Sequence, residues 1–126
     1  MHTEIPVAVD ESLTNLESAK NIIENQSADI FVLKPMLTGS LESILEIINL
    51  GNENEIETVM TTTLGTEIER QACIQLAFAG NLKLACGLAT SDLLVENVIE
   101  TPLIEPTIRK PNENGLGITP SKIPYL

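Results

Sequence analysis

Residues 28–35, Ala-Asp-Ile-Phe-Val-Leu-Lys-Pro, decide the fold of this chain. An unbroken apolar run inside this stretch passes directly into Lys34 and Pro35. Continuous apolar runs, as opposed to alternating ones, are typical of strands buried on both faces, as in a parallel sheet. A second run of this kind occupies residues 5–9 and passes into Asp10. We therefore expect two neighbouring parallel strands, each ending in a charged side chain.

A predicted helix separates these two strands. Between residues 13 and 23 apolar side chains recur every three or four positions, and Thr14 with Glu17 has the form of a capping box. Beyond Lys34 we expect a loop containing Gly39 and Ser40. A second helix then begins near Leu41 and ends near Gly51. The strand–helix unit thus repeats along the chain.

Two further units follow with the same pattern. A strand is expected around residues 56–61, and then a helix that opens with Thr66 and Glu69 as a second possible capping box and ends at Gly80. Residues 84–86 are a plausible fourth strand, and a short helix should run from about residue 91 to 97. Strands that alternate with helices of this length predict right-handed crossovers within a parallel sheet.

The predicted fold class is α/β, and the architecture is the C-terminal half of a (β/α) barrel. Four strand–helix units make half of an eight-stranded barrel, which typically needs about 250 residues, whereas the chain has 126. We expect residues 1–100 to form the barrel units. Residues 101–126, rich in proline, asparagine and glycine, should form an extended tail. An isolated half-barrel exposes strand edges, so we expect this chain to be a fragment.

Charge and composition exclude several classes of function. The chain has 18 acidic and 7 basic residues and a net charge of −11, which repels nucleic acids and anionic membranes. Its apolar runs are too short to span a bilayer, so we expect a soluble cytoplasmic protein. Cys73 and Cys86 should be core residues without a disulfide, and His2 is the only histidine. Any chemistry must therefore use carboxylates and lysines.

Polar residues at the carboxyl ends of the predicted strands carry the candidate chemistry. In a barrel these ends converge on one mouth, where catalytic groups gather. Asp10 and Lys34 on neighbouring strand ends suit a divalent metal ion beside an amine that handles protons or stabilises charge. A lysine there could have a lowered pKa. Taken alone, each of the two residues also fits an ordinary solvated strand end.

An ordered set of motifs resembles the o-succinylbenzoate synthase family of the enolase superfamily. The motifs are residues 9–13 (VDESL), 28–35 (ADIFVLKP) with 37–40 (LTGS), 61–64 (TTTL) and 85–90 (ACGLAT), and the similarity runs from about residue 5 to residue 118. The resemblance implies an enzyme that removes a proton next to a carboxylate and eliminates water through an enediolate intermediate. That lyase reaction gives o-succinylbenzoate, a step toward menaquinone.

The resemblance also implies roles for individual residues. Asp10 matches the last of three carboxylate ligands to Mg²⁺, and Lys34 matches the lysine that acts as acid/base partner or cationic stabiliser. Candidates for binding the succinyl end of a small carboxylate substrate are Thr61, Thr62, Thr63 and Gly87. The implied partners are the N-terminal half of the barrel and a capping domain, because the other lysines and metal carboxylates of the family have no counterpart here.

Two alternatives remain open at this point. An N-acylamino acid racemase or dipeptide epimerase of the same superfamily would use the same lysines and metal. Residues 86–88, Cys-Gly-Leu, lack the DxD motif expected of a dipeptide epimerase, which disfavours that enzyme but not a racemase. The other alternative is a non-catalytic half-barrel remnant. A local departure also stands out, because Gly65 replaces the acidic residue that often follows the threonine run in the family.

Overall fold

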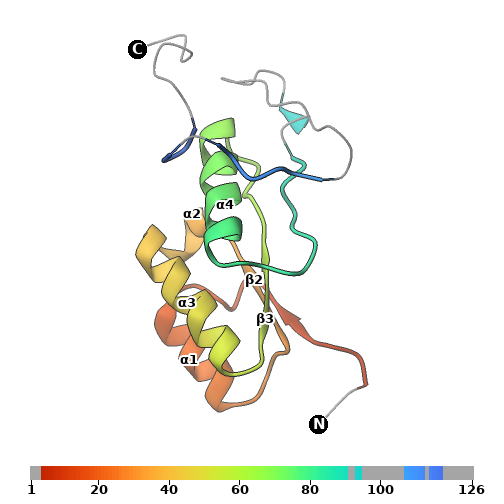
Figure 1. Cartoon of the computed structure of the whole chain (residues 1–126). Coiled ribbons are helices and arrows are strands. Elements are labelled where there is room, and N and C mark those ends of the chain that lie inside the picture. The colour runs from red at the N-terminus through yellow and green to blue at the C-terminus, as the bar shows by residue number, and fades with distance from the viewer. Residues whose placement is uncertain (1–3, 91–92, 95–106, 113, 118–126) are drawn as a thin grey trace.

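A computed structural model describes residues 4–90, 93–94, 107–112 and 114–117. Strands and helices alternate along this part of the chain, and the strands form one parallel sheet in the order β1-β2-β3 (Figure 1). The elements are β1 (Ala8–Val9), α1 (Leu16–Glu24), β2 (Ile30–Leu33), α2 (Pro35–Thr38), α3 (Leu41–Glu53), β3 (Glu57–Met60) and α4 (Glu67–Ala79). The predicted α/β class with parallel strands is confirmed.

One face of the sheet is covered by helices. Phe31, Leu33 and Met60 are 0% exposed and pack in a single core with apolar side chains from α1, α3 and α4. Figure 1 shows these helices on one side of the strands. Because side chains alternate along a strand, every second residue of β2 and β3 contributes to this covered face.

The residues in between form the other face of the sheet. Paired residues of parallel strands point to the same side, and the register sets Ile30 beside Glu57 and Val32 beside Val59. All four of these residues are partly or largely exposed, in contrast to the buried residues of the covered face that alternate with them in the strands. The described residues therefore leave this side of the sheet open to solvent, and we refer to it as the open face.

The first predicted capping box lies one residue too early in the sequence. Asn15, not Thr14, is the N-cap of α1: its side chain accepts a hydrogen bond from the backbone N–H of Ser18 at 2.9 Å. The Ser18 hydroxyl accepts in return from the backbone N–H of Asn15 at 3.0 Å. Asparagine and serine close the box reciprocally, so Glu17 is left in the first turn, where its charge suits the helix dipole.

Helix α3 ends close to Gly51, as predicted, but Gly51 lies inside the last turns of the helix and does not cap it. α3 continues to Glu53, and Gly51 is buried within its last turns. A Cβ at this position would lie 3.3 Å from the Phe31 ring and 3.1 Å from the carbonyl oxygen of Ile56. Glycine is therefore required by the close approach of α3 to the sheet, not by a helix end. The other predicted ends are confirmed: Ser40 is the N-cap of α3, and Gly80 is the C-cap of α4.

The predicted loop at Gly39 and Ser40 is present, but a short helix, α2, precedes it directly after Lys34. Pro35 occupies the first position of α2, where its missing N–H costs nothing and its fixed φ suits a helix. The carbonyl oxygen of Lys34 accepts the backbone N–H and the hydroxyl of Thr38, at 3.1 and 3.0 Å. These bonds fix the backbone directly behind the Lys34 side chain.

The predicted fourth strand, residues 84–86, is not formed, and the next residue, Gly87, makes an isolated parallel bridge with Thr61. The backbone N–H of Gly87 donates to the carbonyl oxygen of Met60 at 2.8 Å. The backbone N–H of Met60, however, bonds the sulfur of Cys86 at 3.4 Å and not a carbonyl group. The ladder consequently does not extend toward residue 84, although the segment lies where the fourth strand was expected.

Some sequence predictions fall largely or wholly outside the described residues. The short helix at residues 91–97 is one of them. The described parts of the tail, residues 107–112 and 114–117, contain neither helix nor strand, and the boundary at residue 100 stays a prediction. Cys73 and Cys86 are free thiols, as expected. No helix in the described ranges has the length and apolar character needed to cross a membrane.

Candidate functional site

Three polar residues follow three neighbouring strands at one edge of the sheet. Asp10 follows β1, Lys34 follows β2 and Thr61 follows β3. The register places all three on the open face, since they continue the rows of Ala8, Val32 and Val59. The backbone N–H of Thr61 also donates to the carbonyl oxygen of Leu33 at 2.9 Å, which holds the ends of β2 and β3 together. The predicted convergence of these strand ends is present.

Asp10 and Lys34 form an ion pair across these strand ends. The Lys34 Nζ lies 2.5 Å from the Asp10 Oδ1 and 3.5 Å from the Glu11 Oε1. The side chain of Lys34 is 21% exposed and that of Asp10 is 36% exposed, whereas Glu11 is almost fully exposed. The close pair is therefore half-sheltered and still reachable from solvent.

Asp10 sets the protonation of Lys34. The hydrogen bond to Asp10 raises the pKa of Lys34 above its ordinary value, against the smaller effect of desolvation, and the charges of Asp10 and Glu11 add to the increase. A lowered lysine pKa had been a possibility, but the structure shows the opposite direction because two carboxylates face the ammonium group. Lys34 is consequently a stable cation at neutral pH in this arrangement.

A small cavity of about 150 Å³ opens beside this ion pair. Asp10, Lys34 and Val32 contribute the sheet side of its wall, and Leu37 and Thr38 of α2 contribute another side. The remaining lining residues are Glu11, Leu13 and Thr14. A carboxylate, an ammonium group and apolar side chains thus share one concave site, a combination typical of sites for small molecules.

The oxygen donors present fit one part of a magnesium site. Mg²⁺ prefers carboxylate oxygens and commonly takes one or two of them together with water. Asp10 supplies such a carboxylate at the cavity wall. Within the described ranges, however, no group of three or more metal-binding His, Cys, Asp or Glu side chains occurs. This part of the chain therefore offers Asp10, with the exposed Glu11 beside it, and not a full ligand set.

Thr61 and Gly87 lie in direct contact. The Thr61 hydroxyl donates to the carbonyl oxygen of Gly87 at 3.2 Å. A Cβ at position 87 would lie only 2.7 Å from the Thr61 Oγ1, so this position requires glycine. Thr61 and Gly87 are therefore the two predicted substrate-binding residues that lie next to each other at the carboxyl ends of the strands, beside Lys34.

Thr62 and Thr63 face other surroundings. Thr62 is buried, and its hydroxyl shares a 2.6 Å hydrogen bond with the hydroxyl of Thr90. Thr63 donates from both its backbone N–H and its hydroxyl to the Glu69 Oε1, at 2.7 and 2.8 Å. The hydroxyl groups of Thr62 and Thr63 thus bond side chains of other segments, whereas the Thr61 hydroxyl bonds the Gly87 backbone at the open face.

Glu69 and Arg70 are polar residues of this region that the sequence did not single out for this purpose. Glu69 was interpreted as a capping-box partner of Thr66, but Thr66 caps α4 without a side-chain hydrogen bond. Arg70 is 2% exposed; its Nε donates to the carbonyl oxygen of Leu88, and its Nη1 to the Glu67 Oε1, each at 2.7 Å. In the sequence, the only sign of these contacts is the group of charged residues in the first turn of α4.

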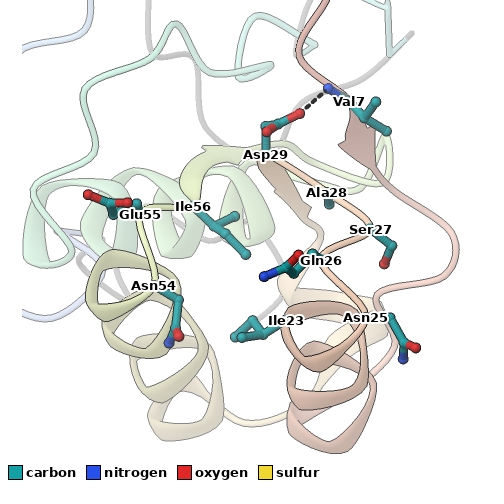
Figure 2. A pocket seen from close by; sticks show the side chains of 10 residues that line it. All are labelled: Val7, Ile23, Asn25, Gln26, Ser27, Ala28, Asp29, Asn54, Glu55 and Ile56. Carbon is teal, nitrogen blue, oxygen red and sulfur yellow. Dashed lines mark hydrogen bonds between the residues drawn. The ribbon is translucent and has the colours of Figure 1, made fainter. Parts of the chain in front are cut away.

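The largest cavity among those described lies at the opposite edge of the sheet. It measures about 580 Å³ and is formed where the chain leaves α1 and α3 and enters β2 and β3 (Figure 2). Asp29 and Glu55 are its acidic residues, and the Asp29 carboxylate accepts the backbone N–H of Val7 at 2.7 Å. Its walls are mainly amide and carboxylate side chains and exposed backbone. It shares no residue with the site around Lys34.

Comparison with known sequences agrees with the resemblance that the sequence motifs indicate. The model of the family described as enolase C-terminal domain-like matches residues 1–123. The o-succinylbenzoate synthase of Thermobifida fusca is 33% identical over 101 residues, which cover 79% of this chain and 31% of that protein. The o-succinylbenzoate synthase of Mycolicibacterium smegmatis is 28% identical over 119 residues, which cover 94% of this chain and 34% of that protein. The chain thus spans about a third of the length of these relatives.

Solved structures agree on the fold. An N-succinyl Arg/Lys racemase from Bacillus cereus superposes with a TM-score of 0.86 at 20% identity, over 96% of this chain and 33% of that protein. A muconate cycloisomerase variant superposes with a TM-score of 0.68 at 26% identity, over 77% of this chain and 27% of that protein. The sheet and helices described above therefore correspond to a portion of larger barrels.

Proposed function

From the premise that this chain belongs to the enolase C-terminal domain-like family, we propose that it forms part of the barrel of a Mg²⁺-dependent lyase similar to o-succinylbenzoate synthase. The observation that carries the proposal is the pair of Asp10 and Lys34 at adjacent strand ends on the open face, with Nζ and Oδ1 2.5 Å apart. The relatives with 33% and 28% identity, both o-succinylbenzoate synthases, support the choice of reaction.

In this proposal Lys34 works as a cation at the mouth of the barrel. Its pKa is raised by Asp10, so the group enters the reaction as an ammonium ion. Such a group stabilises negative charge that develops on a substrate carboxylate, and it can donate a proton to a leaving hydroxyl group. Lys34 is therefore the proposed acid partner and charge stabiliser, and the proton-abstracting base belongs to another part of the barrel.

Asp10 has two proposed roles that depend on its position. It orients the Lys34 ammonium group, and it presents one carboxylate ligand for Mg²⁺. When bound, Mg²⁺ supplies positive charge next to the substrate carboxylate. The remaining carboxylate ligands would come from the N-terminal part of the barrel. The relatives contain such a part, because they are about three times as long as this chain.

Thr61 and Gly87 are the proposed binding residues for the succinyl end of the substrate. Thr61 lies on the same face as Lys34, and the absence of a side chain at Gly87 leaves the Thr61 hydroxyl uncovered on that side. Thr62 and Thr63 contribute by shaping the backbone, because their hydroxyl groups bond Thr90 and Glu69. The substrate is a cyclohexadiene carboxylate that loses water to give o-succinylbenzoate.

The test is reconstitution of a complete barrel. The chain is co-expressed with the N-terminal two-thirds of the Thermobifida fusca relative, and formation of o-succinylbenzoate is measured with and without Mg²⁺. We expect Mg²⁺-dependent turnover that Lys34→Ala reduces by about 10²- to 10⁴-fold, the usual range for loss of an acid/base group. Lys20→Ala, at an exposed lysine of α1, is the matched control and should leave turnover unchanged.

Two results would contradict the proposal. A folded assembly without o-succinylbenzoate formation would exclude the synthase reaction, and racemisation of an N-succinyl amino acid by that assembly would replace it with the reaction named for the Bacillus cereus structure. Turnover that survives Lys34→Ala would remove Lys34 from the reaction.

A further inference from the structure

We propose that Glu69 is a positioning residue that fixes the turn after β3, and through it the Thr61 hydroxyl group, and that Gly65 exists to make room for its carboxylate. This inference rests on the proposed role of Thr61 in substrate binding. It concerns a residue on α4 that reaches no part of the cavity around Lys34.

Glu69 holds Thr63 with a double hydrogen bond. The Glu69 Oε1 accepts the backbone N–H of Thr63 at 2.7 Å and the Thr63 hydroxyl at 2.8 Å. Hydrogen bonds to an ionised acceptor are shorter and stronger than neutral ones. A helix side chain is thereby attached to the loop two residues beyond Thr61, while the backbone bond from Thr61 to Leu33 holds the other end.

Gly65 is required by the position of this carboxylate. A Cβ at residue 65 would overlap the Glu69 Oε2 and lie 2.8 Å from its carboxyl carbon. No side chain larger than hydrogen fits while Glu69 keeps its place. The preceding residue, Leu64, has a φ of 63°, a conformation that branched and bulky residues rarely adopt, so the turn needs an outside contact to keep its shape.

Stability alone does not explain the burial of Glu69. The residue is 6% exposed, and its Oε2 is buried without a hydrogen-bond partner in the described part of the chain. Leaving a polar oxygen unpaired in the interior costs free energy. Its neighbour Arg70 bonds Leu88 and Glu67 instead. A buried carboxylate that accepts both of its hydrogen bonds from Thr63 is best explained by the geometry that it imposes on the turn.

The consequence for the site is a fixed distance between the Thr61 hydroxyl and Lys34. The two residues lie on the ends of adjacent strands and on the same face. If the turn after β3 moved, the Thr61 hydroxyl would lose its contact with Gly87 and its place beside Lys34. Glu69 thus acts on substrate binding through Thr63, without touching the substrate.

Amide hydrogen exchange of Thr63 in the 126-residue chain tests the contact itself. In Glu69→Ala we expect the protection of the Thr63 N–H to fall at least tenfold, because its acceptor is gone. Glu69→Gln keeps an acceptor oxygen and should retain most of the protection. Gly65→Ala should give the same loss as Glu69→Ala, because the added methyl group displaces the carboxylate. Glu17→Ala, an exposed acid in the first turn of α1, is the control and should change nothing.

Substrate kinetics test the consequence in the reconstituted barrel. Glu69→Ala should raise KM about tenfold with a smaller change in kcat, Glu69→Gln should restore KM, and Lys34→Ala should lower kcat. A purely structural Glu69 would change the amount of folded protein but not KM.

The two measurements separate the failure of this inference from that of the proposed function. Unchanged Thr63 exchange in folded Glu69→Ala and Gly65→Ala would overturn the inference even if the barrel makes o-succinylbenzoate. An inactive barrel would overturn the proposed function, and the exchange rates would still decide whether Glu69 fixes the turn. If Glu69→Ala does not fold, Gly65→Ala gives the same decision, and an unchanged Thr63 amide together with an unchanged KM in Gly65→Ala would contradict the inference.

Discussion

The two faces of the sheet carry different kinds of residue, although they alternate within the same strands. On the covered face Phe31, Leu33 and Met60 are fully buried against the helices. On the open face Val32 is partly exposed, and Asp10 and Lys34 extend the same rows into a solvent-accessible ion pair. Adjacent residues such as Leu33 and Lys34 therefore contribute to different properties. The covered face accounts for stability, and the open face carries the proposed chemistry.

The open face is apolar in its middle, and its charged ion pair lies at the carboxyl ends of the strands. Ile30, Val32 and Val59 lie in the middle, as expected of a wall that a complete barrel would bury. Asp10, Lys34 and Thr61 lie only at the carboxyl ends, where the loops of a barrel converge. The relatives, which are about three times as long as this chain, fit the same interpretation.

The largest predicted effect is on stability and is confined to the covered face. Phe31→Ala removes a ring that is 0% exposed and contacts Gly51, so we expect a loss of about 3–5 kcal/mol in the free energy of unfolding. Val32→Ala, the neighbouring residue on the open face, should cost about 1 kcal/mol. Urea unfolding of both variants measures the difference. Equal losses would contradict the assignment of the two faces.

A smaller effect is predicted for the ion pair at the edge of the open face. Because Asp10 raises the pKa of Lys34, the pair stabilises the fold fully below the ordinary lysine value of 10.5, and this contribution disappears as the pH rises through the higher pKa of the folded state. Asp10→Asn should shift the Lys34 midpoint downward and remove this alkaline dependence. NMR titration of the Lys34 side chain measures the midpoint. Asn25→Asp, at the opposite end of the sheet, should leave it unchanged.

Much of the fold could be predicted from the sequence, because the decisive signals are local. The apolar run at residues 30–33 and the helical spacing after Leu41 depend only on neighbouring residues, and both elements are confirmed. The errors came from tertiary contacts. Gly51 resembles a helix end in sequence, but the Phe31 ring decides its role. Residues 84–86 have strand character, but the Cys86 sulfur takes the N–H that would have extended the ladder.

The sequence predicts which residues belong to the candidate site, but it does not predict the contacts between them. Asp10 and Lys34 follow their strands directly, so parallel pairing alone brings them to one edge, as expected. The threonine run is three identical residues in sequence, and only the structure separates Thr61 on the open face from Thr62 and Thr63 in internal hydrogen bonds. The direction of the Lys34 pKa shift likewise required the position of Asp10.

Thiol reactivity at two adjacent positions tests the central claim, that the open face is the inner wall of a barrel. Val32→Cys and Leu33→Cys are each introduced with Cys86→Ala, and Cys73 stays in place because burial raises the pKa of its thiol to about 12. We expect position 32 to react with a polar maleimide at least tenfold faster than position 33 in this chain. The N-terminal part of the Thermobifida fusca relative should then abolish that difference by covering position 32. Equal reactivity of the two positions, or a position 32 that stays reactive in the assembled barrel, would contradict the account.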